Sequence, residues 1–189
     1  MKTLRPALIL IVCSLFAWPA LAGDKKAKVD AARAEKRAKI DAMAKATLDD
    51  LFAKSPAART LFDKAAGHAV FDNTKVAVGI SGGGGQGVAV TGRDGERTYM
   101  KMGTGGIGLG LGAQNYQVVL LFETKASFDA FVEKGWQADA SAQAAAGSAG
   151  ANAEATFKNG VAVWQITDKG LMASADIAGT KYWKNDKLN

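Results

Sequence analysis

The chain is short of the side chains on which most catalytic and metal sites depend. Its 189 residues include one cysteine, Cys13, and one histidine, His68. With a single cysteine no internal disulfide can form, so the core must hold the fold together. His68 directly follows a glycine and is expected to be a capping or partly buried residue. Because no His, Cys or carboxylate cluster is spaced for catalysis or metal binding, we predict a non-enzymatic protein without metal or cofactor.

Nucleotide-binding motifs are also missing, although glycine is abundant. The sequence contains no Gly-Lys pair and therefore no Walker A loop. Two stretches, Gly82–Gly87 and Gly103–Gly108, match the glycine spacing of dinucleotide-binding loops. Such a loop binds pyrophosphate only where it opens a helix, and strand-like residues follow both stretches here. We therefore exclude a nucleotide cofactor.

The long apolar run at the N-terminus is typical of an export signal. A basic start precedes ALILIVCSLFAW, which is too short to span a bilayer comfortably. Ala20–Ala22 then presents small residues at the two positions that define a cleavage site. We expect residues 1–22 to be removed, so that the protein begins at Gly23 in the periplasm or cell envelope. The alternatives are an uncleaved anchor helix and lipidation at Cys13, which the preceding Val12 disfavours.

A basic segment follows this signal. The net charge of +6 favours anionic partners such as phospholipid surfaces. Residues 24–54 lack proline, and apolar residues recur at helical spacing from Ile40 onward. We predict one long helix over residues 23–54, with a docked second half and a solvated, basic first half. The basic residues of that first half are Lys25, Lys26, Lys28, Arg33, Lys36, Arg37 and Lys39.

The rest of the chain predicts short helices and many strands. Ser55 before a proline, with Gly67 as the stop, predicts a short helix, and Thr124–Gly135 predicts another. Large and small residues alternate with period two, as in Val76–Ser81 and Ile107–Gly112. This alternation is typical of half-buried antiparallel strands.

The glycines of these strands predict a close approach between layers. Four glycines, at positions 79, 108, 110 and 112, lie on the small face of strands whose other face is large, which lets a second layer come near. Gly82–Gly85 is interpreted as a bend between two strands, where positive φ costs little. The expected fold class is α+β: a glycine-rich antiparallel β-barrel or sandwich with a long N-terminal helix and short packing helices.

The order of these segments resembles the SYLF domain family. The stretches that carry the resemblance are AAGHAVF (65–71), KVAVGISGGGGQGVAV (75–90), GGIGLGLGAQNYQVVLLF (105–122), ADASAQAAAGSAG (138–150) and DKGLMASADIAG (168–179). The resemblance implies a SYLF-like domain over residues 55–189 that binds lipid. Eukaryotic members bind phosphoinositides, partly through an N-terminal amphipathic helix, and some bind actin. The chain departs from the family at ERTYMKMG, where a Trp-Ser-Pro-Pro-like stretch is common.

We therefore predict non-catalytic binding of anionic phospholipid at an envelope membrane, through the seven basic residues of the first half of the helix. The alternative interpretation of the same basic residues is that they only keep this face of the helix soluble and bind no lipid. An exported protein would not meet actin, so neither actin nor nucleic acid is expected as a partner. The alternative function is a structural or stress-related periplasmic protein that binds protein partners through a polar sheet face. That face would comprise Gln137, Ser141 and Gln143.

Overall fold

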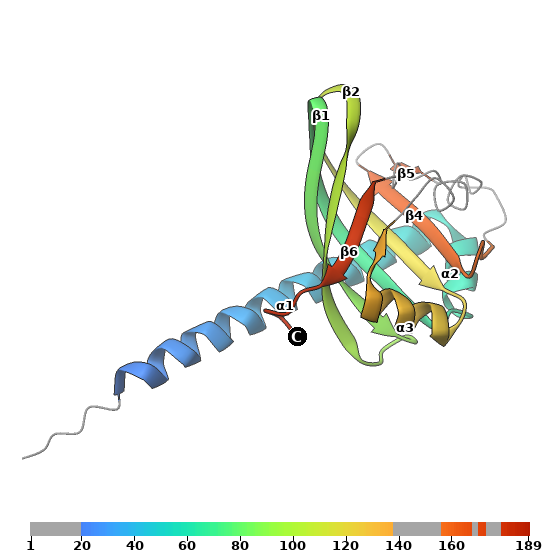
Figure 1. Ribbon diagram of the computed structural model, residues 1–189. Helices are drawn as coiled ribbons and strands as arrows, with labels where there is room; N and C mark the ends of the chain where they lie inside the picture. The colour runs from blue at the N-terminus through green and yellow to red at the C-terminus, as the bar shows by residue number, and fades with distance from the viewer. Residues whose placement is uncertain (1–19, 138–155, 168–169, 173–178) are drawn as a thin grey trace, which may run out of the picture.

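The computed structural model describes residues 20–137, 156–167, 170–172 and 179–189. These residues form three helices and one antiparallel sheet of six strands (Figure 1). The helices are α1 (Ala20–Lys54), α2 (Pro56–Phe62) and α3 (Lys125–Lys134). The strands are β1 (Gly67–Thr91), β2 (Arg97–Phe122), β3 (Trp136–Gln137), β4 (Val161–Thr167), β5 (Gly170–Met172) and β6 (Thr180–Lys184). The predicted α+β class and the long N-terminal helix are confirmed.

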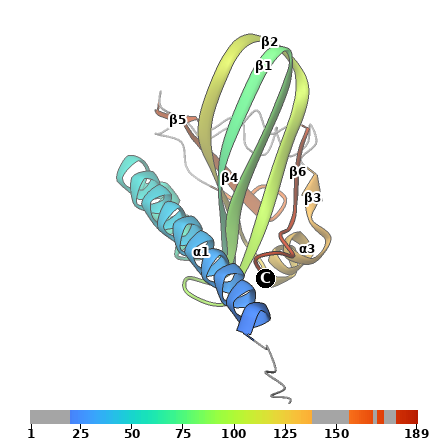
Figure 2. The same cartoon turned by 90° about the vertical axis from the view of Figure 1, so that its left-hand side faces the viewer.

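The sheet is built on one long hairpin, β1 and β2, that folds back on itself (Figures 1 and 2). The two strands pair along their length, with a register shift between Val78 and Ile80. Beyond that shift the pair reverses, so the hairpin contributes to two layers. One end of β2 pairs with β4, which pairs with β5. The other end pairs with β6, which pairs with β3. No pairing among the described strands closes the sheet, so it is a folded, open sheet and not a closed barrel.

The glycines of β1 allow the two layers to approach each other. A Cβ added at Gly83 would lie 2.7 Å from the Thr74 carbonyl oxygen, and one at Gly87 would lie 2.5 Å from Cδ1 of Phe71. A Cβ at Gly85 would collide with the Asp72 carbonyl oxygen. Close packing of the layers therefore occurs at these three positions, but the prediction of a close approach was wrong for Gly112, where an added Cβ would meet nothing within 4 Å. The surroundings of Gly79, Gly108 and Gly110 lie outside the described part of the structure.

The interpretation of Gly82–Gly85 as a bend was wrong. These residues lie inside β1, and each pairs with a residue of Met102–Gly105 on β2. None of the four has positive φ. The reversal of the chain occurs instead near the register shift after Val78. The four glycines are thus needed for close packing and not for a turn.

Both faces of the sheet carry an apolar cluster. The first lies between the two layers, where Phe71, Leu120 and Tyr182 meet Phe128 and Phe131 of α3. The second lies on the opposite face, where α1 and α2 cover the sheet. Its members include Ile40, Leu51, Leu61, Tyr99, Val119, Leu121 and Trp164. Since α1 supplies part of this second cluster, its second half is an integral part of the domain.

The caps of the two short helices follow the expected pattern at three of four ends. The Ser55 hydroxyl accepts a hydrogen bond from the Ala58 backbone N–H, and Thr124 forms a capping box with Ser127. Helix α3 ends at Gly135, whose φ is 69°. Helix α2 ends earlier than predicted, at Phe62 with Asp63 as its C-cap. Gly67, predicted as the end of that helix, is the first residue of β1 because His68 and its neighbours pair with β2.

Candidate functional site

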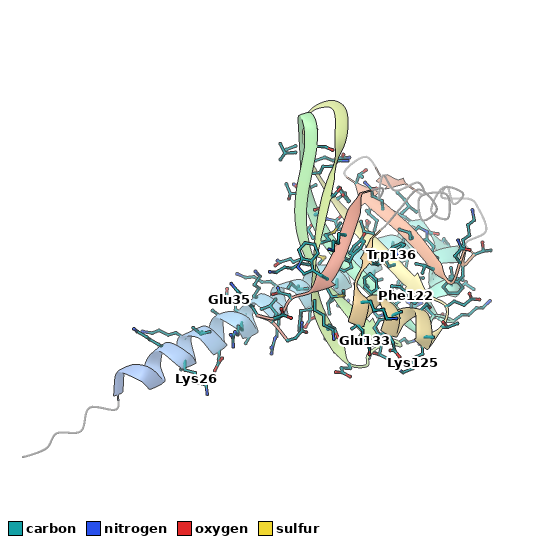
Figure 3. All side chains as sticks on the ribbon, in the orientation of Figure 1. Lys26, Glu35, Phe122, Lys125, Glu133 and Trp136 are labelled. Atoms are coloured by element: carbon teal, nitrogen blue, oxygen red, sulfur yellow. The ribbon has the colours of Figure 1, made fainter. Side chains whose placement is uncertain are left out.

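The first half of α1 projects from the domain, as Figure 1 shows. Residues 25–36 are exposed, whereas Ile40, Ala44 and Leu51 are buried against the sheet. This confirms the predicted division into a solvated and a docked half. Figure 3 shows Lys26 and Glu35 on the projecting part.

All seven predicted binding residues lie on one half of the helix circumference. With 3.6 residues per turn, Lys25, Lys28, Lys36 and Lys39 cluster on one side of Val29, and Lys26, Arg33 and Arg37 on the other. The opposite half carries Ala27, Ala31, Ala34 and Ala38. Val29 itself is 50% exposed. The arrangement produces a cationic stripe with an apolar residue in its middle. The spacing of the charges in the sequence already implies this stripe, although the interpretation of the sequence above does not include it.

Arg33 and Lys39 have carboxylate partners on the same helix. Arg33 lies 3.4 Å from Asp30, and Lys39 lies 2.6 Å from Glu35. The hydrogen bond from Lys39, together with its charge, lowers the pKa of the Glu35 carboxyl. Exposed pairs of this kind are typically worth about 0–1 kcal/mol and exchange readily with water. They therefore leave the stripe able to engage an external anion.

Arg37 has a different role from the other six. Its Nε donates a hydrogen bond to the Leu188 carbonyl oxygen at 2.6 Å, and its guanidinium lies 5.6 Å from the centre of the Tyr99 ring. The Tyr99 hydroxyl donates a hydrogen bond to the Asp41 carboxylate at 3.0 Å. The pKa of Tyr99 is raised, mainly because the hydroxyl is partly buried and to a smaller extent because of this hydrogen bond. Arg37 thus joins α1 to β2 and to the C-terminal residues, and we assign it a structural role.

A polar pocket lies where the stripe meets the sheet. It has a volume of about 380 Å³ and brings Lys36 of α1 next to Lys101 of β2. The remaining lining residues are Asp72, Thr74, Gly84, Gly85, Gln86 and Asn185. Within the described residues, neither lysine has an ion pair or hydrogen bond. Sequence analysis missed Lys101, because no local pattern distinguishes it from other strand lysines.

A second, larger groove of about 510 Å³ lies between α1, α2 and the hairpin turn, with His68 in its wall. The His68 ring is buried, lies 4.8 Å from the Phe62 ring, and has Nδ1 2.9 Å from the Gly92 carbonyl oxygen. Burial lowers its pKa, and the bond to Gly92 opposes this only in part. The expectation of a partly buried structural histidine is therefore confirmed.

The described part of the chain offers few other candidate sites. It contains no cluster of three His, Cys, Asp or Glu side chains able to hold a metal ion. Among the described helices, none is both long enough and apolar enough to cross a bilayer. Both glycine patterns lie in strands and open no helix. Of the polar face predicted for protein partners, Ser141 and Gln143 lie outside the described residues, as does the side chain of Gln137.

The folded glycine-rich hairpin, the long basic helix and the short packing helices define an α+β domain of the SYLF type. Residues 103–189 match the family described as "Ysc84: Las17-binding protein actin regulator". The chain is also 46% identical over 154 residues to a protein of Aeromonas veronii named Beta cell expansion factor A. The alignment covers 82% of this chain and 59% of that relative, so the chain spans about three fifths of the relative's length.

The chain belongs to the SYLF family. Relatives in this family are associated with lipid or actin binding. The family description and the name of the relative both point to a binding or regulatory protein rather than to an enzyme.

Proposed function

We propose that this protein binds anionic phospholipid surfaces without catalysis, through the cationic stripe of α1. The observation that carries the proposal is the gathering of seven cations on one half of the circumference of α1, where all but Arg37 are exposed. A helix needed only for folding would not project into solvent with its charges on one side. The exposed Val29 adds an apolar group that can enter the interface between headgroups and acyl chains.

The expected strength of this interaction follows from its charge. Each Lys or Arg close to an anionic membrane contributes about 1 kcal/mol, and the attraction falls off within a Debye length. Three such residues are therefore worth about a hundredfold in affinity. Because Arg37 also holds the C-terminal residues, the cleanest residues to test are at the far end of the helix, at Lys25, Lys26 and Lys28.

We further propose that the protein acts in the periplasm or cell envelope after removal of residues 1–22. The basic start, the short apolar stretch and the small residues at Ala20–Ala22 support this location. In that compartment the available ligand is the anionic phospholipid of the envelope, and actin is absent. Although the family description names an actin regulator, we do not propose actin binding for this chain.

The test is co-sedimentation with phosphatidylcholine vesicles that either contain or lack phosphatidylglycerol. We expect the wild-type protein to bind only the anionic vesicles, and more weakly at higher salt. Reversing Lys25, Lys26 and Lys28 to glutamate should reduce binding at least a hundredfold while the thermal midpoint stays unchanged. The matched control reverses three exposed lysines elsewhere, Lys64, Lys134 and Lys187, so that both variants have the same net charge.

Two outcomes would contradict the proposal. If the helix variant bound as well as wild type, the stripe would be a solubilising face. If both variants lost binding equally, the attraction would depend on net charge and not on α1.

A further inference from the structure

The pocket between α1 and the folded hairpin has the composition of an anion site. Lys36 approaches from the helix and Lys101 from β2, and the one carboxylate in the lining is Asp72. The Asp72 carboxylate accepts a hydrogen bond from the Gln117 amide at 3.4 Å, so part of its hydrogen-bonding capacity is used inside the fold. Two lysines without ion pairs against one carboxylate leave the pocket with net positive charge.

Uncharged polar side chains line the pocket together with the two lysines. Gln86 pairs directly with Lys101 across the two strands, so both side chains lie on the same face of the sheet. Thr74 and Asn185 also line the pocket, but the Thr74 hydroxyl already donates to the Asn115 Oδ1 at 2.9 Å. Gly84 leaves the backbone uncovered, because an added Cβ there would meet only the Met102 carbonyl oxygen at 3.9 Å, and this lets a ligand come close to the main chain. The amides of Gln86 and Asn185 beside two cations match a group with several charged oxygens.

Asn185 supplies an independent sign of a missing partner. The residue is 2% exposed, and its Oδ1 is buried with no hydrogen-bond partner among the described residues. Its backbone N–H donates to the Tyr99 carbonyl oxygen at 2.9 Å, which holds the residue at the pocket. Turning the amide by half a turn would present its N–H2 instead, and the two orientations are equivalent in shape. A buried amide with an unused atom costs stability unless something binds to it.

We propose that this pocket binds a phosphomonoester group, held by Lys36 and Lys101 and completed by Gln86 and Asn185. A phosphomonoester carries about −1.5 to −2 charges near pH 7 and three strong acceptor oxygens, which suits two lysines with neutral donors. The volume of about 380 Å³ is at the lower end of the range for ligand pockets and suits a headgroup rather than a large ligand.

The source of the phosphate is a lipid headgroup. Lys101 also pairs with Trp183 of β6, so this tryptophan, which is 39% exposed, lies on the same face of the sheet. Amphipathic aromatic rings favour the membrane–water interface. In this respect the inference rests on the proposed function, because it places the pocket beside the surface that would face the bilayer. The binding of a free phosphomonoester does not depend on that function.

The sharpest variant is Gly84→Asp, with Gly82→Asp as its matched control. A Cβ at Gly84 would meet only the Met102 carbonyl oxygen, at 3.9 Å, and one at Gly82 would meet nothing within 4 Å. Both residues are exposed on the same strand, so the two variants share their charge and their strand propensity. Of these two glycines, Gly84 lines the pocket and Gly82 does not. A third variant, Lys101→Gln, removes one of the two cations.

The first experiment titrates the full chain with glycerol 3-phosphate, a soluble phosphomonoester, by calorimetry. We expect binding by wild type and by Gly82→Asp, and a loss of at least tenfold in Gly84→Asp and Lys101→Gln. The second compares vesicles with phosphatidic acid, a phosphomonoester, and vesicles with phosphatidylglycerol, a phosphodiester, at equal surface charge. Wild type should prefer phosphatidic acid, and Gly84→Asp should lose that preference but still bind phosphatidylglycerol through α1.

Each outcome separates the pocket from the helix. If wild type showed neither glycerol 3-phosphate binding nor a preference for phosphatidic acid, or if Gly82→Asp lost as much as Gly84→Asp, the pocket would be rejected. Binding of glycerol 3-phosphate without a vesicle preference would reject only the lipid as the source. Failure of the proposed function would appear elsewhere, as unchanged binding of phosphatidylglycerol vesicles by the variant with Lys25, Lys26 and Lys28 reversed.

Discussion

At the scale of single residues, the glycines of β1 decide whether the sheet can fold over. Gly83, Gly85 and Gly87 face the opposite half of the same strand, where backbone oxygens and the Phe71 ring occupy the space of a Cβ. Gly82 lies on the other face of the strand, where the space is open. Neighbouring glycines in the same run therefore differ: a side chain is excluded at Gly83, Gly85 and Gly87 but would fit at Gly82.

We expect Gly87→Ala to destabilise the protein by about 1–3 kcal/mol, because the methyl group would overpack the site beside the fully buried Phe71. Gly82→Ala should be neutral or stabilising by about 0.4–1 kcal/mol, since it reduces the freedom of the unfolded chain without meeting any atom. Urea denaturation of the two variants measures both effects. Equal stability of the two would contradict the close packing of the layers.

His68 predicts a pH dependence of stability. Burial holds its folded-state pKa below the ordinary value of 6.5, against smaller opposing effects of the Gly92 carbonyl and Asp94. The unfolded chain therefore binds the proton more readily than the folded chain. The contribution of His68 should be fully present above about pH 6.5 and should decline as the pH falls below that value.

The measurement is the free energy of unfolding between about pH 5 and pH 8. His68→Asn keeps a donor for the Gly92 carbonyl oxygen but cannot titrate, so the decline near pH 6 should disappear in this variant. Carboxylates titrate mostly below pH 5 and affect both proteins alike. A wild-type stability that stays flat through this range would show that His68 is accessible to protons in the folded state.

At the scale of elements, α1 combines two functions along one continuous helix. From Ile40 onward it is part of the core, and before that it is a charged projection. Arg37 lies at the transition and joins the helix to the last residues of the chain through Leu188. The direction of the projection is set by contacts at that point rather than by the solvated residues themselves.

Replacing Arg37 by alanine should cost about 1.5–3 kcal/mol, the usual range for a hydrogen bond to a charged group. Replacing Arg33, whose pairing with Asp30 is exposed, should change stability by less than about 0.5 kcal/mol. Vesicle binding should weaken in the Arg33 variant, because Arg33 belongs to the exposed part of the stripe. Denaturation and vesicle binding of the pair test this, and equal stabilities would argue against the role of Arg37 in holding the C-terminal residues.

At the scale of the whole molecule, the signal-like segment 1–22 that precedes the folded domain predicts an exported protein from which this segment is removed. The protein isolated from the cell envelope should begin at Gly23, because Ala20–Ala22 supplies the small residues of a cleavage site. Intact-mass analysis of protein from that fraction measures the N-terminus directly. A chain that still contains Cys13, acylated or not, would contradict the prediction, and substitution of Ala22 by a large residue should block cleavage.

The sequence by itself determined the features whose signals lie within a few residues of one another. Hydroxyl caps and a glycine stop located α3, the period-two alternation indicated antiparallel strands, and the onset of apolar periodicity at Ile40 separated the two halves of α1. The family followed from the order of the glycine-rich segments. Each of these depends on local hydrogen bonding, backbone freedom or burial of one face, which neighbouring residues specify.

Only the tertiary structure decided how distant segments meet. It placed Gly82–Gly85 inside a strand, because the partner residues on β2 and the opposite half of β1 determine what that stretch must accommodate. It also placed Lys101 beside Lys36 and Arg37 against Leu188. Such neighbours are separated by long stretches of chain, and their meeting depends on how the hairpin folds over and where α1 docks. No local pattern encodes that geometry, because it arises from packing both faces of the sheet at once.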